Sequence, residues 1–329
     1  MKKKKIIFLD RKWNGKINGP TVWRDGLINE MKKQAQVNYF EVHPNIFKAL
    51  HLFFKNYKTF REAEIIQTHI ADFSIILLCL IGKVMGKEHV HMLHGNHILE
   101  KKDKGIIMYL KYELIIRIAN VVIFPTSYLQ KELLKQRKLK KTFVLPPGID
   151  LEIKNKKSIP KEVANFIDIT SFHRLEKARG IVPLINAFNA VKRKKDKLLI
   201  IGGGFYLDQF KEKYSSSQVI FVGHKDNPYD WLKKSDVFVH CSFLESFGIA
   251  VIEAIAHNLP VITVNVQGLP EAAGDAAIIV EPNEKELEQA LITIRSQKVR
   301  KDLIKKGKKH IKKFKWNKIV KKLLEIYSS

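Results

Sequence analysis

The chain contains the stretch Glu245-Ser-Phe-Gly-Ile-Ala-Val-Ile-Glu253, which follows one apolar run at residues 237–241 and precedes another at residues 260–264. Apolar runs of this length are typical of buried strands, and the segment between them has room for a loop and a short helix. The pattern therefore predicts strand, loop, helix and strand in that order. It places one carboxylate, Glu245, on the loop and the other, Glu253, inside the helix.

The start of this helix is a candidate anion site. Ser246 is a good N-cap residue, and the amides of Phe247, Gly248 and Ile249 would then point out of the helix start. Gly248 has no side chain that could block a ligand. Two acids that bracket a phosphate site suit a nucleotide sugar, whereas two solvated acids on a surface helix are the alternative interpretation of the same spacing.

The arrangement resembles the E-x7-E signature of retaining glycosyltransferases with the GT-B fold, above all those of glycosyltransferase family 4. In that family the second glutamate holds the ribose hydroxyls, the first contacts the donor sugar, and the amides between them meet the sugar and the diphosphate. The resemblance implies that Glu253 binds the ribose and that Glu245 meets the sugar. It implies backbone contacts for Phe247, Gly248 and Ile249.

Length and composition indicate a globular protein with two domains. The chain has 329 residues, of which 45% are hydrophobic, enough to bury substantial cores. Cys79 and Cys241 both lie in apolar runs, as expected of buried thiols in a reducing compartment. The apolar run at 6–9 is too short for a signal peptide, and the longest run, 75–81, is too short to span a bilayer. We therefore expect a cytoplasmic protein, or one that is peripheral on the inner face of the cell membrane.

The formal net charge of +26 is unevenly distributed. Residues 1–155 carry 28 basic and 14 acidic side chains, residues 156–294 carry 17 of each, and residues 295–322 carry 14 basic side chains against Asp302 alone. A merely solubilising charge stays an alternative, but a Lys-rich composition alone would not explain a neutral middle. If the last helix returns to the first domain, the two basic regions join. We expect such a surface to attract anionic membranes.

Apolar runs alternate with helical patterns in both halves of the chain, which predicts parallel sheets covered by helices. The strands expected in the first half are at residues 6–9, 37–42, 65–69, 89–93, 121–124 and 142–145, with helices at 73–84 and 106–119. Those expected in the second half begin at residue 166 and include 198–201, 219–223 and 277–280. Pro146-Pro-Gly-Ile-Asp150, between the halves, resembles the family's hinge.

Two turns of the first half contain candidate ligand residues. In the resembled family a glycine after the first strand lies against the donor diphosphate, which implies this role for Gly19, although a plain turn glycine is an equal alternative. His94-Gly95 follows a strand at its C-terminal end, where ligands of open α/β sheets bind. The family has His-Gly here, and the resemblance implies that His94 approaches the donor sugar and phosphate. The histidines of 89–97 lack acidic or cysteine partners at ligand spacing, so we expect no metal.

The loop at 172–180 is basic and contains Arg174, Lys177 and Arg179. In the resembled family an arginine and a lysine clamp the donor diphosphate here. The resemblance implies this role for Arg174, with Arg179 in place of the lysine, and arginine can bind a diphosphate through two oxygens. Lys177 could share the task.

Two later loops complete the expected donor site. Gly202-Gly-Gly204 fails as a dinucleotide fingerprint because Leu207 stands where the third glycine belongs. In the resembled family this is a phosphate-side glycine loop, which implies contact with Gly203. The loop that starts at His224 is where the family presents backbone groups to the base.

The sequence is thus similar to GT-B enzymes over its whole length. We expect an α/β fold with two Rossmann-like domains whose parallel sheets face each other across a cleft. The acceptor domain is predicted at residues 1–155 with a C-terminal helix at 315–329, and the nucleotide-sugar donor domain at 156–314. Trp316 matches the tryptophan at which the family's final helix crosses back to the first domain.

The resemblance implies a retaining hexosyltransferase that uses a UDP-sugar and an anionic glycan or lipid-linked acceptor, as in the synthesis of bacterial surface polysaccharides. No cofactor is expected, because two arginines and helix-start amides can balance the diphosphate charge that a divalent ion balances in other transferases. Two alternatives stay open. A GT-B epimerase or phosphorylase would share the nucleotide or phosphate site, and a nucleic-acid-binding protein would explain the charge but lacks the usual aromatic and basic motifs.

Overall fold

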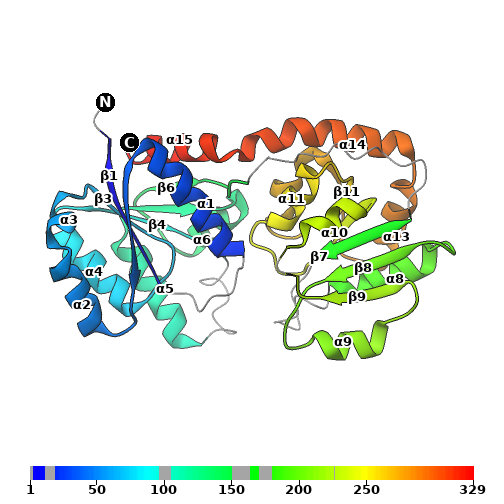
Figure 1. Ribbon diagram of the computed structural model, residues 1–329, viewed down its shortest axis with the longest axis horizontal. Helices are drawn as coiled ribbons and strands as arrows, with labels where there is room; N and C mark the ends of the chain where they lie inside the picture. Colours follow the sequence, from blue (N-terminus) through cyan, green and yellow to red (C-terminus); the bar gives the residue numbers. More distant parts are fainter. Residues whose placement is uncertain (1–2, 12–18, 96–104, 150–163, 170–179, 226) are drawn as a thin grey trace. The chain divides into compact units, whose positions relative to one another are not determined.

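The computed structural model describes residues 3–11, 19–95, 105–149, 164–169, 180–225 and 227–329. The chain divides into two compact units (Figure 1). Unit 1 comprises Met1–Asp150 and Phe314–Ser329, and unit 2 comprises Leu151–Lys313. Each unit is built on one six-stranded sheet.

The sheet of unit 1 is parallel and has the strand order β2-β1-β3-β4-β5-β6. Its strands are β1 (Lys5–Arg11), β2 (Gln36–Val42), β3 (Ile65–Thr68), β4 (Glu88–Met92), β5 (Val121–Phe124) and β6 (Thr142–Val144). The central strands β3, β4 and β5 are buried on both sides. In β5 the sequence is a continuous apolar run, as expected of a buried parallel strand, whereas β3 and β4 also bury the polar residues Gln67, Thr68, His89 and His91. The predicted strands and helices of this unit agree with the observed ones apart from one or two residues at their ends.

Helices cover both faces of this sheet. One face carries α1 (Gly19–Gln34) and α15 (Trp316–Ile326), whose apolar residues share a core with Ile6 and Phe8 of β1. The opposite face carries α2 (Ile46–Lys55), α3 (Tyr57–Glu62), α4 (Phe73–Val84), α5 (Ile106–Ile118) and α6 (Ser127–Gln136). Ile7 and Leu9 of β1 belong to this second core, because successive side chains of a strand point to opposite faces.

The sheet of unit 2 is also parallel, in the order β12-β11-β10-β7-β8-β9. Its strands are β7 (Asn165–Ile169), β8 (Lys197–Ile201), β9 (Val219–Gly223), β10 (Val237–His240), β11 (Val261–Val264) and β12 (Ala277–Val280). Its helices are α8 (Ile181–Val191), α9 (Leu207–Tyr214), α10 (Tyr229–Lys234), α11 (Ile249–Ala256), α12 (Leu269–Ala273), α13 (Glu284–Thr293) and α14 (Gln297–His310). All strands of a parallel sheet end at one edge, so the loops that follow them share that edge. The predicted α/β class with two parallel sheets is confirmed.

Trp316 at the start of α15 is buried in unit 1 against two glycines. A β-carbon built on Gly26 of α1 would lie 2.4 Å from Cζ2 of Trp316, and one built on Gly148 would lie 2.3 Å from its Cε3. The amide of Ile149 also donates a hydrogen bond to the carbonyl oxygen of Phe314 at 2.8 Å. These contacts hold the C-terminal helix on the first unit, although more than 150 residues of sequence lie between the two segments.

We expect Trp316→Ala to lower the free energy of unfolding by about 3–5 kcal/mol, because a large buried ring is removed. Gly26→Ala should lower it by about 1–3 kcal/mol, because the added methyl group would overlap the indole. Urea unfolding measures both changes. In a Trp316→Leu background the Gly26→Ala change should cost less, and an unchanged cost there would contradict the assignment of the indole as the constraint.

Candidate functional site

The loop that joins β10 to α11 differs from the prediction at the helix start. α11 begins at Ile249, and Gly248 precedes it as the N-cap residue with φ 98°, in the left-handed region that favours glycine. The prediction that Ser246 caps this helix is therefore wrong. Two backbones approach closely here, because a β-carbon built on Gly268 would lie 2.2 Å from the carbonyl oxygen of Ser246. This contact keeps Ser246 in the loop, and the chain enters the helix only after the turn at Gly248.

The first amides of α11 are those of Ile249 and Ala250. The next two, of Val251 and Ile252, donate to the carbonyl oxygen of Gly248 at 3.0 and 3.3 Å. A helix start directs its first N–H groups outward and carries the positive end of the helix dipole. The candidate anion site therefore comprises the amides of Ile249 and Ala250. The sequence pattern indicated the first of these amides but not the second.

Packing fixes the two residues that precede the helix. Phe247 as a whole is only 5% exposed, so its ring is packed inside unit 2 and cannot contact a ligand. A β-carbon on Gly248 would lie 2.7 Å from Cδ2 of Leu269, in addition to the strain that a positive φ imposes on other residues. Glycine is thus required at position 248 by both conformation and space.

Glu245 is anchored by its backbone and leaves its carboxylate partly accessible. Its amide donates to Oε1 of Gln267 at 2.9 Å, and its carbonyl oxygen accepts from the amide of Gly268 at 3.2 Å. Its side chain is 28% exposed. The segment after β11 therefore positions the loop of Glu245 at the carboxyl edge of the sheet.

A buried ion pair lies behind this loop. His240, the last residue of β10, has Nδ1 2.8 Å from Oδ1 of Asp168 on the neighbouring strand β7, and both side chains are buried. Nε2 of His240 lies 3.8 Å from Oε2 of Glu245. Burial lowers the pKa of His240, but the two carboxylates outweigh it and raise the pKa to about 10. His240 is therefore an imidazolium at neutral pH, which donates to Asp168 and attracts Glu245.

Sequence reasoning missed His240 and Asp168 as functional residues. An acid inside a buried strand is costly unless it is paired, so Asp168 within Asn165–Ile169 was the available signal. The partner is 72 positions away in sequence, and only the order of β7 and β10 in the sheet brings the two together.

Glu253 lies in α11 in a different environment. Its Oε1 accepts a hydrogen bond from the hydroxyl of Tyr229 at 2.9 Å, and the ring of Tyr229 stacks on His257 with centroids 5.2 Å apart. Burial raises the pKa of Glu253 to about 7, although the bond from Tyr229 acts in the opposite direction. This carboxyl group is therefore poised between its neutral and charged forms at physiological pH.

Two other residues predicted to bind the nucleotide sugar, Gly203 and His224, lie in contact with each other. A β-carbon on Gly203, in the loop after β8, would lie 2.9 Å from Cβ of His224, in the loop after β9. Gly180, at the start of α8, has equally little room, because a β-carbon there would lie 2.1 Å from the carbonyl oxygen of Cys241. The chain thus enters α8 beside the end of β10. Arg174, Lys177 and Arg179 lie outside the described residues.

His94 lies in unit 1, just after β4, at the end of a line of hydrogen-bonded side chains. Nε2 of Gln67 is 2.9 Å from Nε2 of His69, whose Nδ1 is 2.6 Å from Nε2 of His94. An amide nitrogen only donates, so His69 must carry its proton on Nδ1 and donate to His94. The remaining proton of His94 is then on Nδ1. Gly19, predicted as a loop residue, is the first residue of α1.

His94 is a neutral imidazole in this setting. Burial, the neighbouring His69 and the positive charge of Arg24 lower its pKa well below the usual value. Its ring also packs edge-on against Trp23, with centroids 4.2 Å apart. Within the described part of the chain, Nδ1 of His94 has no hydrogen-bond partner. The predicted ligand residue of unit 1 is therefore neutral, and its N–H on Nδ1 is buried.

Residues 152–310, most of unit 2, match the family model described as "Glycosyl transferases group 1". The chain is 29% identical over 269 residues to "Uncharacterized glycosyltransferase MJ1059" of Methanocaldococcus jannaschii, a match that covers 74% of this chain and 64% of that protein. It is 31% identical over 195 residues to the "N-acetylgalactosamine-N,N'-diacetylbacillosaminyl-diphospho-undecaprenol 4-alpha-N-acetylgalactosaminyltransferase" of Campylobacter jejuni, which covers 56% of this chain and 53% of that protein. The chain thus spans between half and two thirds of the length of these relatives.

Among solved structures, Anabaena Alr3699/HepE in complex with UDP-glucose resembles this chain with a TM-score of 0.76 and 17% identity, over 98% of this chain and 99% of that one. At this identity the likeness shows the fold, and the predicted GT-B fold is confirmed. The chain is thus similar to group 1 glycosyltransferases over residues 152–310 and shares their fold over nearly its whole length. No helix within the described residues has the length and apolar character needed to cross a bilayer.

We expect His240→Gln to lower the free energy of unfolding by about 3–5 kcal/mol, because the buried carboxylate of Asp168 loses its cationic neighbour. The folded-state pKa of His240 is raised, so its contribution is complete below the unfolded value of 6.5 and is lost as pH rises through about 10. Urea unfolding of the wild type should therefore show an alkaline loss of stability that His240→Gln lacks.

The matched control is His257→Gln, which changes a partly buried histidine of the same unit whose pKa is lowered. This variant should keep the alkaline loss of the wild type. An equal loss in all three proteins would show that His240 is not the group that titrates.

Proposed function

We propose that the protein is a retaining, metal-independent glycosyltransferase of family 4, which transfers a hexose from a UDP-sugar to a glycan or lipid-linked acceptor. The observation that carries the proposal is the construction of the β10–α11 loop. It combines outward amides at Ile249 and Ala250 with two carboxylates in different electrostatic environments. A nucleotide sugar needs these three contacts: an anion site, a group for the ribose and a group for the sugar.

In this proposal Glu253 binds the ribose. A carboxylate accepts hydrogen bonds from two vicinal hydroxyls, and its negative charge strengthens them. Glu253 is such a group in a largely buried place, and the bond from Tyr229, like bonds from ribose hydroxyls, favours its charged form against the effect of burial. The ring of Tyr229 stacks on His257, which holds the hydroxyl donor of Glu253 in place.

The diphosphate would be bound by the amides of Ile249 and Ala250 together with Arg174 and Arg179, with Lys177 as a neighbour. Gly180, the next described residue in the sequence, packs against the carbonyl oxygen of Cys241, directly after β10. Positive groups placed where negative charge grows on the leaving phosphate stabilise the transition state. They would supply the charge that a metal ion balances in other transferases.

Glu245 would contact the hydroxyls of the donor sugar, because its carboxylate is accessible and its loop is fixed by Gln267 and Gly268. His94 would add a neutral N–H donor to the sugar or phosphate. Retention, as the family resemblance implies, would follow from attack of the acceptor hydroxyl on the face that the phosphate leaves. The leaving phosphate oxygen would then accept the proton of that hydroxyl, so that no protein base is needed.

The acceptor side of the proposal is a lipid-linked or anionic glycan at a membrane surface, as in the synthesis of bacterial surface polysaccharides. The net charge of +26 and the name of the Campylobacter jejuni relative, which specifies a diphospho-undecaprenol substrate, support it. A basic surface attracts anionic lipids by about 1 kcal/mol for each well-placed lysine or arginine. The protein would thus bind peripherally to the membrane on which its acceptor lies.

A donor screen tests the reaction. Purified protein is incubated with UDP-, GDP- and ADP-sugars and an undecaprenol-linked oligosaccharide, without and with a chelator, and the released nucleotide is measured. We expect UDP release that depends on the acceptor and is unchanged by the chelator. Isomerisation of a donor without any acceptor would identify an epimerase instead, and loss of activity with the chelator would contradict metal independence.

Substitutions of the two glutamates should have different effects on UDP binding and on turnover. We expect Glu253→Gln to weaken UDP binding about tenfold and Glu245→Gln to spare UDP but lower turnover, because in this proposal only Glu253 contacts the ribose. Wild-type affinity for UDP should also rise between about pH 6 and pH 8, as Glu253 ionises near pH 7. Isothermal titration measures both effects.

Glu253→Gln serves as the control for the pH dependence, since the phosphates of UDP titrate equally in both proteins. The part of the pH step that belongs to Glu253 should be absent from this variant. An equal loss of UDP affinity in the two variants would contradict the division of roles.

A further inference from the structure

Large apolar side chains are exposed together on three helices of unit 1. α2, α4 and α5 cover the same face of the sheet and lie side by side. Oγ of Ser74 donates to the carbonyl oxygen of Pro44 at 2.6 Å beside the starts of α2 and α4, and Nζ of Lys83 donates to that of Ile118 at 3.4 Å at the ends of α4 and α5. Their outward side chains, here named the apolar face, include Phe47, Phe54, Leu80, Val84, Ile107 and Leu110.

These exposures are too large and too close together to be scattered surface residues. Phe47 is 80% exposed, Phe54 69% and Val84 90%. On α2 and α4 the exposed residues recur at helical spacing, as Phe47 and Phe54 do. On α5, Ile107, Leu110 and Leu114 form such a stripe, and Ile106 and Met108 are exposed beside it. Among the described residues of unit 2, by contrast, only Phe205 and Ile292 are exposed large apolar side chains. Extended apolar patches of this kind mark interaction surfaces.

The charge around the apolar face indicates what covers it. α2 and α4 contain no acidic residue, and their lysines are Lys48, Lys55 and Lys83. The one acid of α5, Glu113, bonds to Arg117 at 2.8 Å and to Arg137. Apolar side chains among unopposed lysines fit a bilayer with anionic headgroups, because the rings can enter the interface while lysine stems reach the phosphates.

On the opposite face of unit 1, the C-terminal helix α15 has exposed lysines but no exposed large apolar side chains. Its exposed lysines are Lys318, Lys321 and Lys322. The expectation that all basic residues of 295–322 join unit 1 is also wrong, because α14 belongs to unit 2. Since α15 and α2 cover opposite faces of one sheet, a flat membrane cannot contact both (Figure 1).

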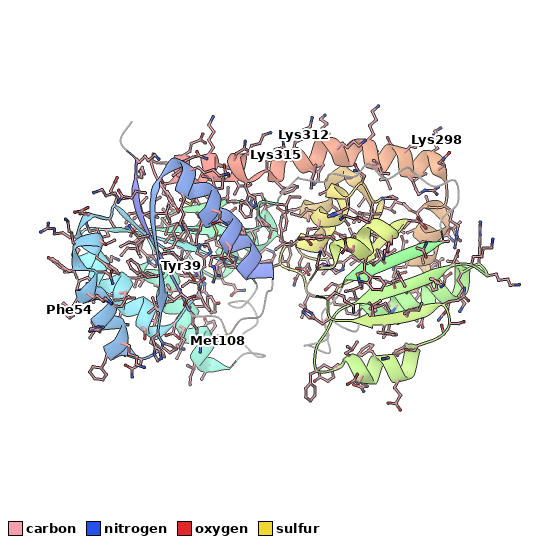
Figure 2. All side chains as sticks on the ribbon, viewed as in Figure 1. Tyr39, Phe54, Met108, Lys298, Lys312 and Lys315 are labelled. Atoms are coloured by element: carbon pink, nitrogen blue, oxygen red, sulfur yellow. The ribbon has the colours of Figure 1, made fainter. Side chains whose placement is uncertain are left out.

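We propose that unit 1 docks on an anionic lipid bilayer through the apolar face of α2, α4 and α5, and not through its basic C-terminal helix. Phe54 on α2 and Met108 on α5 are two of the exposed side chains on these helices (Figure 2). The inference rests on the membrane association that the proposed function contains, and it names the surface responsible. Bound this way, α15 faces away from the membrane.

Vesicle flotation tests the inference on the full chain, with vesicles of phosphatidylcholine alone and of phosphatidylcholine with phosphatidylglycerol. We expect the wild type to float with the anionic vesicles only. Phe47→Ser with Phe54→Ser should lower binding at least about tenfold, because aromatic rings no longer enter the interface. Lys48→Gln with Lys55→Gln should lower it about 30-fold at low salt. High salt should weaken wild-type binding without abolishing it, since the rings remain.

The matched controls remove equivalent groups elsewhere. Lys318→Gln with Lys322→Gln removes two charges from α15, and Phe205→Ser removes an exposed ring from unit 2. Both should bind within about twofold of the wild type, since neither change touches the apolar face. All changed side chains are exposed, so thermal unfolding and UDP affinity should match those of the wild type and exclude misfolding.

Other outcomes overturn the inference and identify what replaces it. Loss of binding in the α15 variant alone would place the contact on α15 and leave the proposed function intact. If the wild type transfers sugar but binds no vesicle, the proposed membrane association is wrong while the proposed reaction stands. A wild-type dimer in light scattering that Phe47→Ser with Phe54→Ser dissolves, without vesicle binding, would make the apolar face a contact between copies of this chain.

Discussion

The candidate donor site depends on the close approach of two backbone segments, the loop before α11 and the residue Gly268. With the carbonyl oxygen of Ser246 against Gly268, no β-carbon fits, and the loop can turn into the helix only through the left-handed conformation of Gly248. The start of α11, the outward amides and the separation of Glu245 from Glu253 follow from this contact. In a phosphate site made of backbone amides, the packing of the backbone determines where the amides lie. Glycines occur at the contact points because only they let the backbone segments approach this closely.

Buried histidines behave in opposite ways in the two units because their neighbours differ. Beside two carboxylates His240 stays charged, whereas burial, with a smaller contribution from the positive charges of Arg24 and Lys83, lowers the pKa of His69 and of His89 to about 3. In unit 2 the imidazolium of His240 thus attracts the carboxylate of Glu245. In unit 1 His94 is a neutral imidazole with its proton on Nδ1. The two units should therefore respond to pH in opposite directions. The histidines with lowered pKa values reduce the free energy of unfolding as pH falls below about 6.5, whereas the contribution of His240 is lost as pH rises toward about 10.

The sequence predicted those parts of the fold that depend on local composition. Buried parallel strands are continuous apolar runs, so residues 121–124 were located correctly without tertiary information. The cap residue Gly248 was missed because a contact between Ser246 and Gly268 overrides the cap preference of Ser246. Asp168 and His240 were missed because their pairing depends on strand order. Sequence gives the residue types of a site more reliably than its partners, which only the sheet topology brings together.

A count of charges along the chain could not identify a membrane surface, because it treats every basic residue as exposed. Arg300 is buried and donates to the carbonyl oxygen of Ile294 at 3.0 Å, and Arg295 pairs with Asp196 at 2.6 Å. These cations of the basic tail stabilise unit 2 internally and attract little outside it. The apolar residues of α2 and α4 could not be recognised as a surface either, because an apolar stripe on a helix predicts that its residues are buried. Only the structure shows that these helices bury one side and expose another, so that modest charge and exposed rings coincide on one face. Coulomb attraction then brings the protein to the bilayer, and the rings supply the part of the affinity that salt does not screen.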